Sequence, residues 1–200
     1  MNYSSIAFSE ASKKIQEKAG SRVNYARMEK QPQEDGLTEN EIDFISERDG
    51  FYMATVGDNG FPYIQFRGGP KGFLKVLDGK RLGFIDFRGN MQYISAGNLA
   101  TNNKVALILM DYAAKARLKI YAEAEIVELK DDPALLNQLN IADYKFRPER
   151  MMVLHIKAFS WNCPQHITPR YTLEEIEEGF ASQLEHIASL EAEIKELKAR

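Results

Sequence analysis

Two segments of the chain combine glycine with arginine in a way that suits phosphate binding. The first is Arg67-Gly68-Gly69-Pro70-Lys71-Gly72, and Lys75 follows in the next apolar run. Glycines let the backbone approach a ligand closely, and an arginine can hold a phosphate through two hydrogen bonds. The alternative interpretation of this segment is a flexible turn with solvated charges.

The second segment is Asp86-Phe87-Arg88-Gly89-Asn90-Met91-Gln92-Tyr93, which leads from an apolar run into a helix expected over residues 90–100. Free N–H groups at a helix start attract anions, and Arg88 adds positive charge nearby. Alternatively, Asn90 only caps the helix and Arg88 is a surface charge. This segment alone leaves both interpretations open.

A third segment runs from Trp161 to Arg170 and contains two prolines. A tryptophan and an arginine at this spacing can flank a planar ring or hold an anionic group. The alternative is that Trp161 belongs to the core and that Cys163 is an inert buried thiol. Arg117 and Lys119 share one face of an expected strand, where they address either a phosphate or solvent.

The histidines do not predict a metal site. His155 falls in an expected strand, His166 in the third segment and His186 in an expected helix, so the three share no metal-ligand spacing. We therefore expect no metal.

The elements that must position these residues are mainly strands. Runs rich in β-branched, aromatic and aliphatic residues predict strands at 51–57, 62–68, 73–77, 82–87, 104–112, 118–129 and 151–161. Asp58-Asn59-Gly60 predicts a hairpin turn between the first two. Seven such runs fit a closed sheet. The apolar run 104–110 predicts a strand buried on both faces at the centre of the barrel.

Helices are expected at both ends of the chain and between strands. Ser9 can cap a helix ending at Gly20, a loop is expected at 31–36, and Thr38 with Glu41 forms a capping box. Further helices are expected at 90–100 and 133–140. From residue 173 onward, apolar residues alternate at spacings of three and four over about four heptads, which is typical of a coiled coil. Thr172 with Glu175 caps this helix, and Gln183 interrupts its apolar positions.

Composition narrows the function. The 200 residues are 44% hydrophobic, which suits one main domain, and the net charge of −3 argues against a nucleic-acid partner. The longest apolar run has far fewer than the roughly 20 residues of a membrane span. With one cysteine and no secretory signal pattern at the N-terminus, we expect a soluble, cytoplasmic protein with no membrane partner.

Taken together, the segments resemble the FMN-binding split-barrel family of pyridoxamine 5'-phosphate oxidases, and more closely its oxidase-related branch. The matching stretches are Met53-Ala-Thr-Val-Gly-Asp-Asn-Gly-Phe-Pro-Tyr, Gln65-Phe-Arg-Gly-Gly-Pro, Gly83-Phe-Ile-Asp-Phe-Arg-Gly-Asn-Met-Gln-Tyr-Ile-Ser and Trp161-Asn-Cys-Pro-Gln-His-Ile. The resemblance implies a mainly β (α+β) fold, a six- to seven-stranded antiparallel split β-barrel with outer helices. The expected organisation is an N-terminal helical extension at 1–36, the barrel at 37–171 and a coiled-coil helix at 172–200.

The resemblance also implies a homodimer that binds FMN between its two subunits. Gln65, Arg67 and Gly68 would touch the ribityl-phosphate or ring, Asp86 and Phe87 would present backbone along the flavin, and Arg88, Asn90 and Gln92 would reach the phosphate. From the second subunit, Arg117, Trp161, Asn162 and Arg170 would approach the isoalloxazine. Asn90-Met91-Gln92 replaces the Ser-Arg-Lys phosphate cluster of the true oxidases, so Arg67, Lys75 and Arg88 become the candidate phosphate cations.

Three functions are compatible with these features. The first is an FMN-dependent oxidoreductase acting on a small-molecule substrate or electron donor, in which flavin N5 carries the redox chemistry. The second is a non-catalytic flavin-binding or sensing protein whose coiled-coil tail docks a partner. The third is a related split barrel that binds deazaflavin or haem, the haem with His155 or His166 as its axial ligand.

Overall fold

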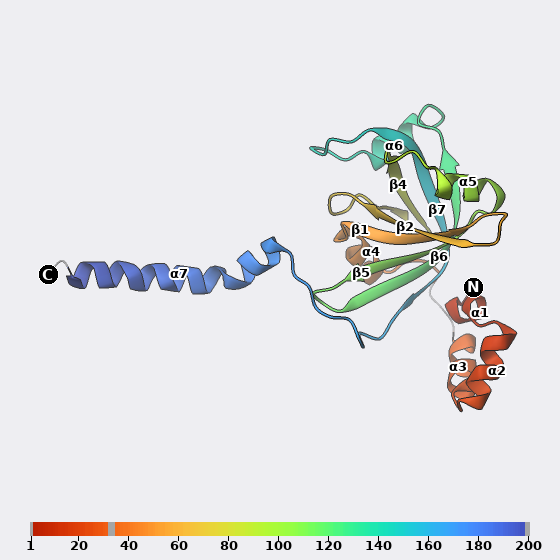
Figure 1. The fold of residues 1–200 in the computed structure, drawn as a ribbon, viewed down its shortest axis with the longest axis horizontal. Coiled ribbons are helices and arrows are strands. Elements are labelled where there is room, and N and C mark those ends of the chain that lie inside the picture. Colours follow the sequence, from red (N-terminus) through yellow and green to blue (C-terminus); the bar gives the residue numbers. More distant parts are fainter. Residues whose placement is uncertain (1, 32–34, 199–200) are drawn as a thin grey trace. The chain divides into compact units, whose positions relative to one another are not determined.

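A computed structural model describes residues 2–31 and 35–198 of the chain. Within them, seven strands form one antiparallel sheet in the order β2-β1-β5-β6-β7-β4-β3 (Figure 1). The strands are β1 (Gly50–Val56), β2 (Pro62–Gly68), β3 (Lys75–Asp78), β4 (Arg81–Phe87), β5 (Lys104–Asp111), β6 (Ala116–Val127) and β7 (Pro148–Trp161). The helices are α1 (Tyr3–Ala7), α2 (Glu10–Lys18), α3 (Arg22–Lys30), α4 (Glu39–Ser46), α5 (Ile94–Thr101), α6 (Pro133–Leu139) and α7 (Leu173–Lys198).

The sheet curls so that strands far apart in its order share one interior. The ring centroids of Phe51 on β1 and Phe84 on β4 lie 5.4 Å apart, and Phe73 stacks on Phe51 at 5.7 Å. Because side chains alternate between the two faces of a strand, every second residue of the central strands points into this core. The largest fully buried strand residues include Met53, Leu82, Leu109, Leu118 and Ile120. The expected antiparallel split barrel with outer helices is confirmed.

The first hairpin forms as predicted. β1 pairs with β2 from Gly50 opposite Gly68 to Val56 opposite Pro62, and Gly60 takes a φ of +76° in the turn. Three other strands begin two or three residues from the predicted start, and one of them is β6, which begins at Ala116 instead of residue 118. β3 begins at Lys75 because the preceding residues turn back, the N–H of Phe73 donating to the carbonyl of Pro70 at 3.0 Å. β7 begins at Pro148, three residues before the predicted start.

β5 lies inside the sheet between β1 and β6, but only one of its faces is fully buried. Val105, Leu107 and Leu109 are buried, whereas the alternate residues Ala106 and Ile108 are half-buried. The prediction of a strand buried on both faces is therefore wrong for the single protomer. The helices of this chain leave the outer face of β5 partly open.

The N-terminal caps form as the sequence predicts. Ser9 accepts a hydrogen bond from the N–H of Ser12 at the start of α2, and Thr38 with Glu41 makes a complete capping box on α4. The sequence did not predict α1 and α3 as separate helices. Within the loop expected at 31–36, residues 32–34 lie outside the described residues. α1 contacts the outer face of the barrel, where the ring of Tyr3 stacks on Tyr121 at 4.9 Å.

α7 belongs to a second compact unit, residues 112–115 and 165–200, distinct from the unit that contains the barrel. It is one continuous helix, and Thr172 and Glu175 cap its start as predicted, the hydroxyl of Thr172 accepting from the N–H of Glu175 at 3.2 Å. None of the described helices combines the length and the apolar composition that crossing a membrane requires.

Candidate functional site

A polar cavity of about 280 Å³ brings Arg67 of the first predicted segment together with most of the second segment, although Arg88 is not part of its wall. It lies between β2, β4 and the segment that leads into α5. The predicted site residues that line it are Gln65, Arg67, Asp86, Phe87, Asn90 and Gln92. Tyr63, Gly89, Met91, Tyr93, Ile94, Ser95, Ala96 and Glu149 complete its wall. The cavity therefore unites residues from three separate parts of the chain: β2, the region around the start of α5, and the beginning of β7.

Arg67 is the buried cation of this cavity. Its side chain is 8% exposed, and its guanidinium forms an ion pair with Asp86 and lies 5.2 Å from the ring centroid of Phe84. The Nε atom of Arg67 is buried without a hydrogen-bond partner in the described part of the chain. Arg150 reaches the same carboxylate, with its Nε 3.8 Å from Oδ2 of Asp86. A buried guanidinium with an unused donor is a candidate contact for an anionic or hydrogen-bonding ligand.

Glu149 forms the second charged centre. The hydroxyl of Tyr93 donates to its Oε1 at 3.0 Å, Nε of Arg88 lies 3.6 Å from the same oxygen, and Nη2 of Arg150 lies 3.2 Å from Oε2. The hydrogen bond to Glu149 raises the pKa of Tyr93 above its ordinary value. The site contains three arginines, Arg67, Arg88 and Arg150, and two carboxylates, Asp86 and Glu149. By simple count its net charge is +1 (3 − 2).

The helix that was expected to begin at residue 90 begins at Ile94 instead. Met91 and Tyr93 take left-handed φ values of 59° and 52°, so the helix cannot extend through them. Asn90 closes a turn, its Oδ1 accepting from the N–H of Gln92 at 3.1 Å, and does not cap α5. The first turn of α5 still forms part of the cavity wall, because Ile94 and its two successors line it, and the first N–H groups of a helix have no partner within the helix.

Ser95 fixes the position of a predicted site residue. This serine is 3% exposed and donates from its Oγ to Oε1 of Gln65 at 2.8 Å. The bond links the first turn of α5 to β2 and leaves the amide nitrogen of Gln65 as a donor for a ligand.

The remaining predicted site residues lie elsewhere in the protomer. Trp161 donates from its indole N–H to Oε1 of Glu41 at 2.6 Å and packs edge-on against Phe44 at 4.7 Å. The N–H of Asn162 donates to the carbonyl of Arg117 at 3.2 Å. Lys75 pairs with Gly83 in the sheet, Gly68 ends β2, and the guanidinium of Arg170 lies 5.1 Å from the ring of Tyr112 in the second unit. Cys163 is exposed, so its interpretation as a buried thiol is wrong.

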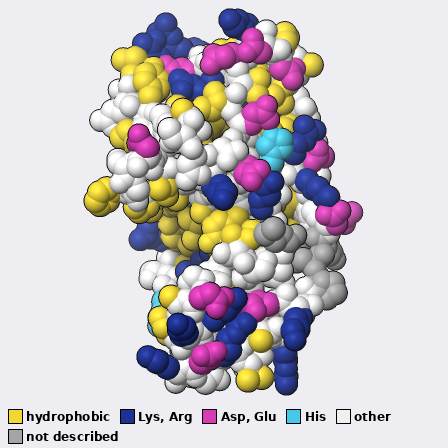
Figure 2. All heavy atoms as spheres, turned by 90° about the vertical axis from the view of Figure 1, so that its right-hand side faces the viewer, with side chains coloured by type: hydrophobic (Ala, Val, Ile, Leu, Met, Phe, Trp, Pro, Cys, Tyr) yellow, Lys and Arg dark blue, Asp and Glu magenta, His cyan; other side chains and the backbone are white. Residues whose placement is uncertain are grey.

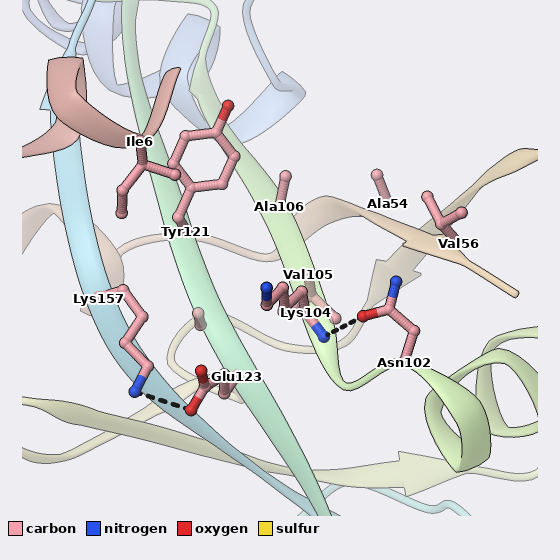
Figure 3. A pocket seen from close by; sticks show the side chains of 11 residues that line it. Ile6, Ala54, Val56, Asn102, Lys104, Val105, Ala106, Tyr121, Glu123 and Lys157 are labelled. Carbon is pink, nitrogen blue, oxygen red and sulfur yellow. Dashed lines mark hydrogen bonds and ion pairs between the residues drawn. The ribbon is translucent and has the colours of Figure 1, made fainter. Parts of the chain in front are cut away.

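A larger cavity of about 500 Å³ lies on the outer face of the sheet and has mostly apolar walls (Figure 3). The apolar wall includes Ile6 from α1, Ala54, Ala106 and Tyr121. The lining also includes Lys157 and Glu123, which form an ion pair at 2.7 Å. Figure 2 shows hydrophobic side chains gathered across the middle of one face of the molecule, with charged side chains above and below. The predicted site residues do not line this cavity, so we take the polar cavity as the candidate site.

Sequence reasoning missed Arg150, Glu149, Tyr93 and Ser95. Arg150 faces Asp86 because β4 and β7 are neighbours and these two residues are paired in the ladder. The order of strands in a sheet cannot be read from local patterns, and the predicted start of β7 at 151 excluded both 149 and 150. A signal was available in the Pro-Glu-Arg sequence at 148–150, which places opposite charges beside an expected strand.

The model of the pyridoxamine 5'-phosphate oxidase family matches residues 37–160, more than half of the chain. The chain belongs to this family. Among solved structures, HupZ from Group A Streptococcus is 18% identical with a TM-score of 0.50, covering 68% of this chain and 99% of its own, and it shows the same fold.

Two further solved structures are similar to this chain. A candidate pyridoxamine 5'-phosphate oxidase from Lactobacillus delbrueckii is 28% identical with a TM-score of 0.47, over 62% of this chain and 93% of its own. An FMN-binding protein from Syntrophomonas wolfei is 11% identical with a TM-score of 0.48, over 74% of this chain and 97% of its own. No protein with a curated description matches the chain.

Proposed function

We propose that this chain is an FMN-binding flavoprotein that acts, as a cytoplasmic homodimer, as an FMN-dependent oxidoreductase on a small molecule. The observation that carries the proposal is the polar cavity, in which the buried Arg67, with its unused Nε, converges with the first turn of α5. FMN is the cofactor that the family resemblance implies, and its phosphate needs cations and N–H donors of this kind.

The residues of the cavity suit the phosphate end of FMN. The N–H groups at the start of α5 can donate to phosphate oxygens, and Arg88, with a side chain 35% exposed, has room to turn from Glu149 toward an anion. The side chain of Gln65 is held by Ser95 for a polar contact with the ribityl chain or ring. Arg150, which the resemblance did not include, joins Arg67 and Arg88 as a third candidate cation.

The cavity is small for the whole cofactor, since pockets for drug-sized ligands measure roughly 300–1,000 Å³. At about 280 Å³, it provides room for part of FMN, and the flat ring must extend beyond it. A second subunit that covers the ring would exclude water from it. Arg117, Trp161, Asn162 and Arg170 are the residues we propose to reach the ring from that subunit, and Arg117 also has a buried Nε without a partner among the described residues.

The outer face of the sheet supports the proposed homodimer. Tyr52, Ile64 and Phe66 are 39%, 65% and 58% exposed on neighbouring strands β1 and β2. Apolar side chains gathered in this way on one face are typical of protein–protein contact surfaces. Their burial against a second barrel would also cover the open face of β5.

When bound, FMN supplies the redox chemistry through its isoalloxazine ring. The chain itself holds the phosphate, orients the ring and limits access of water. This division of roles agrees with the cavity wall, in which the described side chains include no cysteine, lysine or histidine. The same observation keeps a non-catalytic flavin-binding or sensing role as the second candidate function.

Haem and deazaflavin remain as alternative ligands. Neither His155 nor His166 lines the polar cavity, and His155 lies 2.9 Å from Glu125, so neither histidine supplies an axial haem ligand in that cavity.

The absorbance spectrum of the purified protein separates the three ligands FMN, deazaflavin and haem. We expect a yellow protein that releases FMN on denaturation. A protein without flavin absorbance that also fails to bind FMN in calorimetry would contradict the proposal, and turnover with NADH or NADPH would separate the enzyme from the sensor.

A further inference from the structure

The helix α7 exposes an apolar stripe along its length, interrupted only at Gln183 among its described heptad positions. Its 26 residues span about 39 Å at 1.5 Å per residue. Eight large apolar side chains along it are between 43% and 79% exposed: Leu173, Ile176, Phe180, Leu184, Ile187, Leu190, Ile194 and Leu197. Most helical stability in proteins comes from packing such a face against another element. We therefore expect another structural element to pack against this apolar stripe.

We propose that α7 pairs with the α7 of a second copy of this chain, as a parallel, in-register, two-stranded coiled coil. The inference deepens the homodimer proposed above and does not depend on the identity of the cofactor. It assigns the occupant, the direction and the register of the helix pair.

The heptad positions favour two strands in the second half of the helix. With Leu173 as a, the a positions are 173, 180, 187 and 194, and the d positions are 176, 183, 190 and 197. Ile187 and Ile194 at a alternate with Leu190 and Leu197 at d. β-branched residues at a with leucine at d favour parallel two-stranded coiled coils.

Gln183 distinguishes the two possible directions. In a parallel, in-register pair, Gln183 at d faces Gln183 of the second copy, and each amide can both donate and accept. In an antiparallel pair with full overlap, a residues face d residues, so Gln183 faces Ile187. That arrangement buries an amide against an apolar side chain, which is costly without a hydrogen-bond partner.

The charged residues at the e and g positions also favour the parallel direction of the helix pair. In a parallel pair, each g residue lies beside the e residue of the following heptad in the other helix. Glu193 then lies beside the oppositely charged Lys198, and His186, whose imidazole can donate a hydrogen bond, lies beside Glu191. In the antiparallel pair, Glu177 would lie beside Glu191, which places like charges together. Charge complementarity thus supports the parallel arrangement.

Leu184 also fits the parallel arrangement. It occupies an e position next to Gln183 and is 58% exposed. In the parallel register its neighbour on the other helix is Gly179 at g, which has open space where a Cβ would lie. The missing side chain leaves room for the leucine, which compensates for the polar layer at Gln183.

Disulfide cross-linking in the full-length chain tests the proposal. Cys163 is the only cysteine, so the variants are made with Cys163→Ser. On mild oxidation, Gln183→Cys should be captured almost entirely as a disulfide-linked dimer. Ser182→Cys, one residue away at the outward c position, is the matched control and should cross-link at least tenfold more slowly. Equal rates for the two variants, or no cross-link at Gln183→Cys, would overturn the pairing.

A second experiment tests the direction. Gln183→Cys and Ile187→Cys chains with tags of different size are co-expressed and oxidised. The parallel pair predicts that Gln183→Cys cross-links to itself, whereas predominance of the mixed 183–187 disulfide would overturn the parallel direction. FMN content is measured on the same samples. Cross-linking at 183 without flavin contradicts only the cofactor proposal, and flavin without cross-linking contradicts only the tail proposal.

Discussion

The ion pair between Arg67 and Asp86 joins two strands that stand far apart in the order of the sheet. Arg67 belongs to β2 at one edge, and Asp86 belongs to β4, next to the strand at the other edge. The pair therefore helps to close the split barrel while it holds the guanidinium at the polar cavity. Removing either partner should affect both the ligand and the barrel.

Replacing Arg67 with alanine should weaken FMN binding by about 1.5–3 kcal/mol, the scale of a charge-assisted hydrogen bond. The barrel should still fold, because Arg150 remains near Asp86 at 3.8 Å. Calorimetric titration with FMN measures the change. Arg81→Ala is the matched control, since Arg81 pairs with Asp78 on the surface. An unchanged dissociation constant in Arg67→Ala would remove this residue from the site.

Glu149→Gln should tighten FMN binding, by roughly 0.5–1.5 kcal/mol at low salt, if the phosphate lies in the polar cavity. The variant removes the carboxylate that competes for Arg88 and Arg150, and it raises the counted site charge from +1 to +2 (3 − 1). Titrations at low and high ionic strength check this, because the gain should shrink with salt. Weaker binding at low salt would place the phosphate elsewhere.

Glu41 should contribute to acid sensitivity of the barrel. Burial raises the pKa of this carboxyl, but the hydrogen bonds from Thr38 and Trp161 outweigh burial and hold the pKa below 4.5. A lowered pKa gives stability that is present above the unfolded-state value and is lost as pH falls through the folded-state value. Denaturant unfolding of Glu41→Gln should therefore depend less on pH below about 4.5. The exposed Glu47→Gln is the control, and equal pH dependence of Glu41→Gln and the unsubstituted protein would argue against this role.

Removing residues 172–200 should leave a dimer that binds FMN, because the outer sheet face, not the tail, is proposed to provide most of the contact between barrels. Sedimentation of the truncated protein measures this directly. A monomer that still binds FMN tightly would contradict the shared site.

Replacing both Ile187 and Leu190 with lysine should abolish much of the helicity of the tail while FMN binding stays intact. These residues occupy adjacent a and d positions of the stripe, and charges there oppose helix pairing. Circular dichroism and flavin titration provide the two measurements. Loss of flavin or aggregation in the double variant would instead show that α7 packs on the barrel.

Much of the barrel could be predicted because strand patterns are local. Each of the seven predicted runs overlaps a strand, and the capping residues Ser9, Thr38 and Thr172 lie where their side chains predict. The start of α5 could not be predicted, because Met91 and Tyr93 adopt left-handed conformations that their residue types disfavour. Tertiary contacts hold these residues in place, as the bond from Tyr93 to Glu149 shows.

The candidate site could be predicted only where its residues lie close together in the sequence. Arg67 was found from one glycine-containing segment and Asp86 with Phe87 from another, whereas Gln65 came only from the family resemblance; the cavity unites all four. Arg150 and Glu149 come from a strand whose neighbour is decided by the topology of the sheet. The prediction that the outer face of β5 is buried was wrong for a related reason. An apolar sequence does not show whether the residues that pack against a strand come from the same chain or from another.

Trp161 gives this chain a built-in optical reporter. It is the only tryptophan, and its indole N–H is bound to Glu41, a residue 120 positions earlier in the chain. In the flavin-free protein, its fluorescence therefore reports the junction between α4 and the end of the last strand. Detachment of α4 would break the bond and expose the indole to water, so the emission should shift to longer wavelength before the barrel unfolds. Local opening of this junction can thus be followed without attaching a dye.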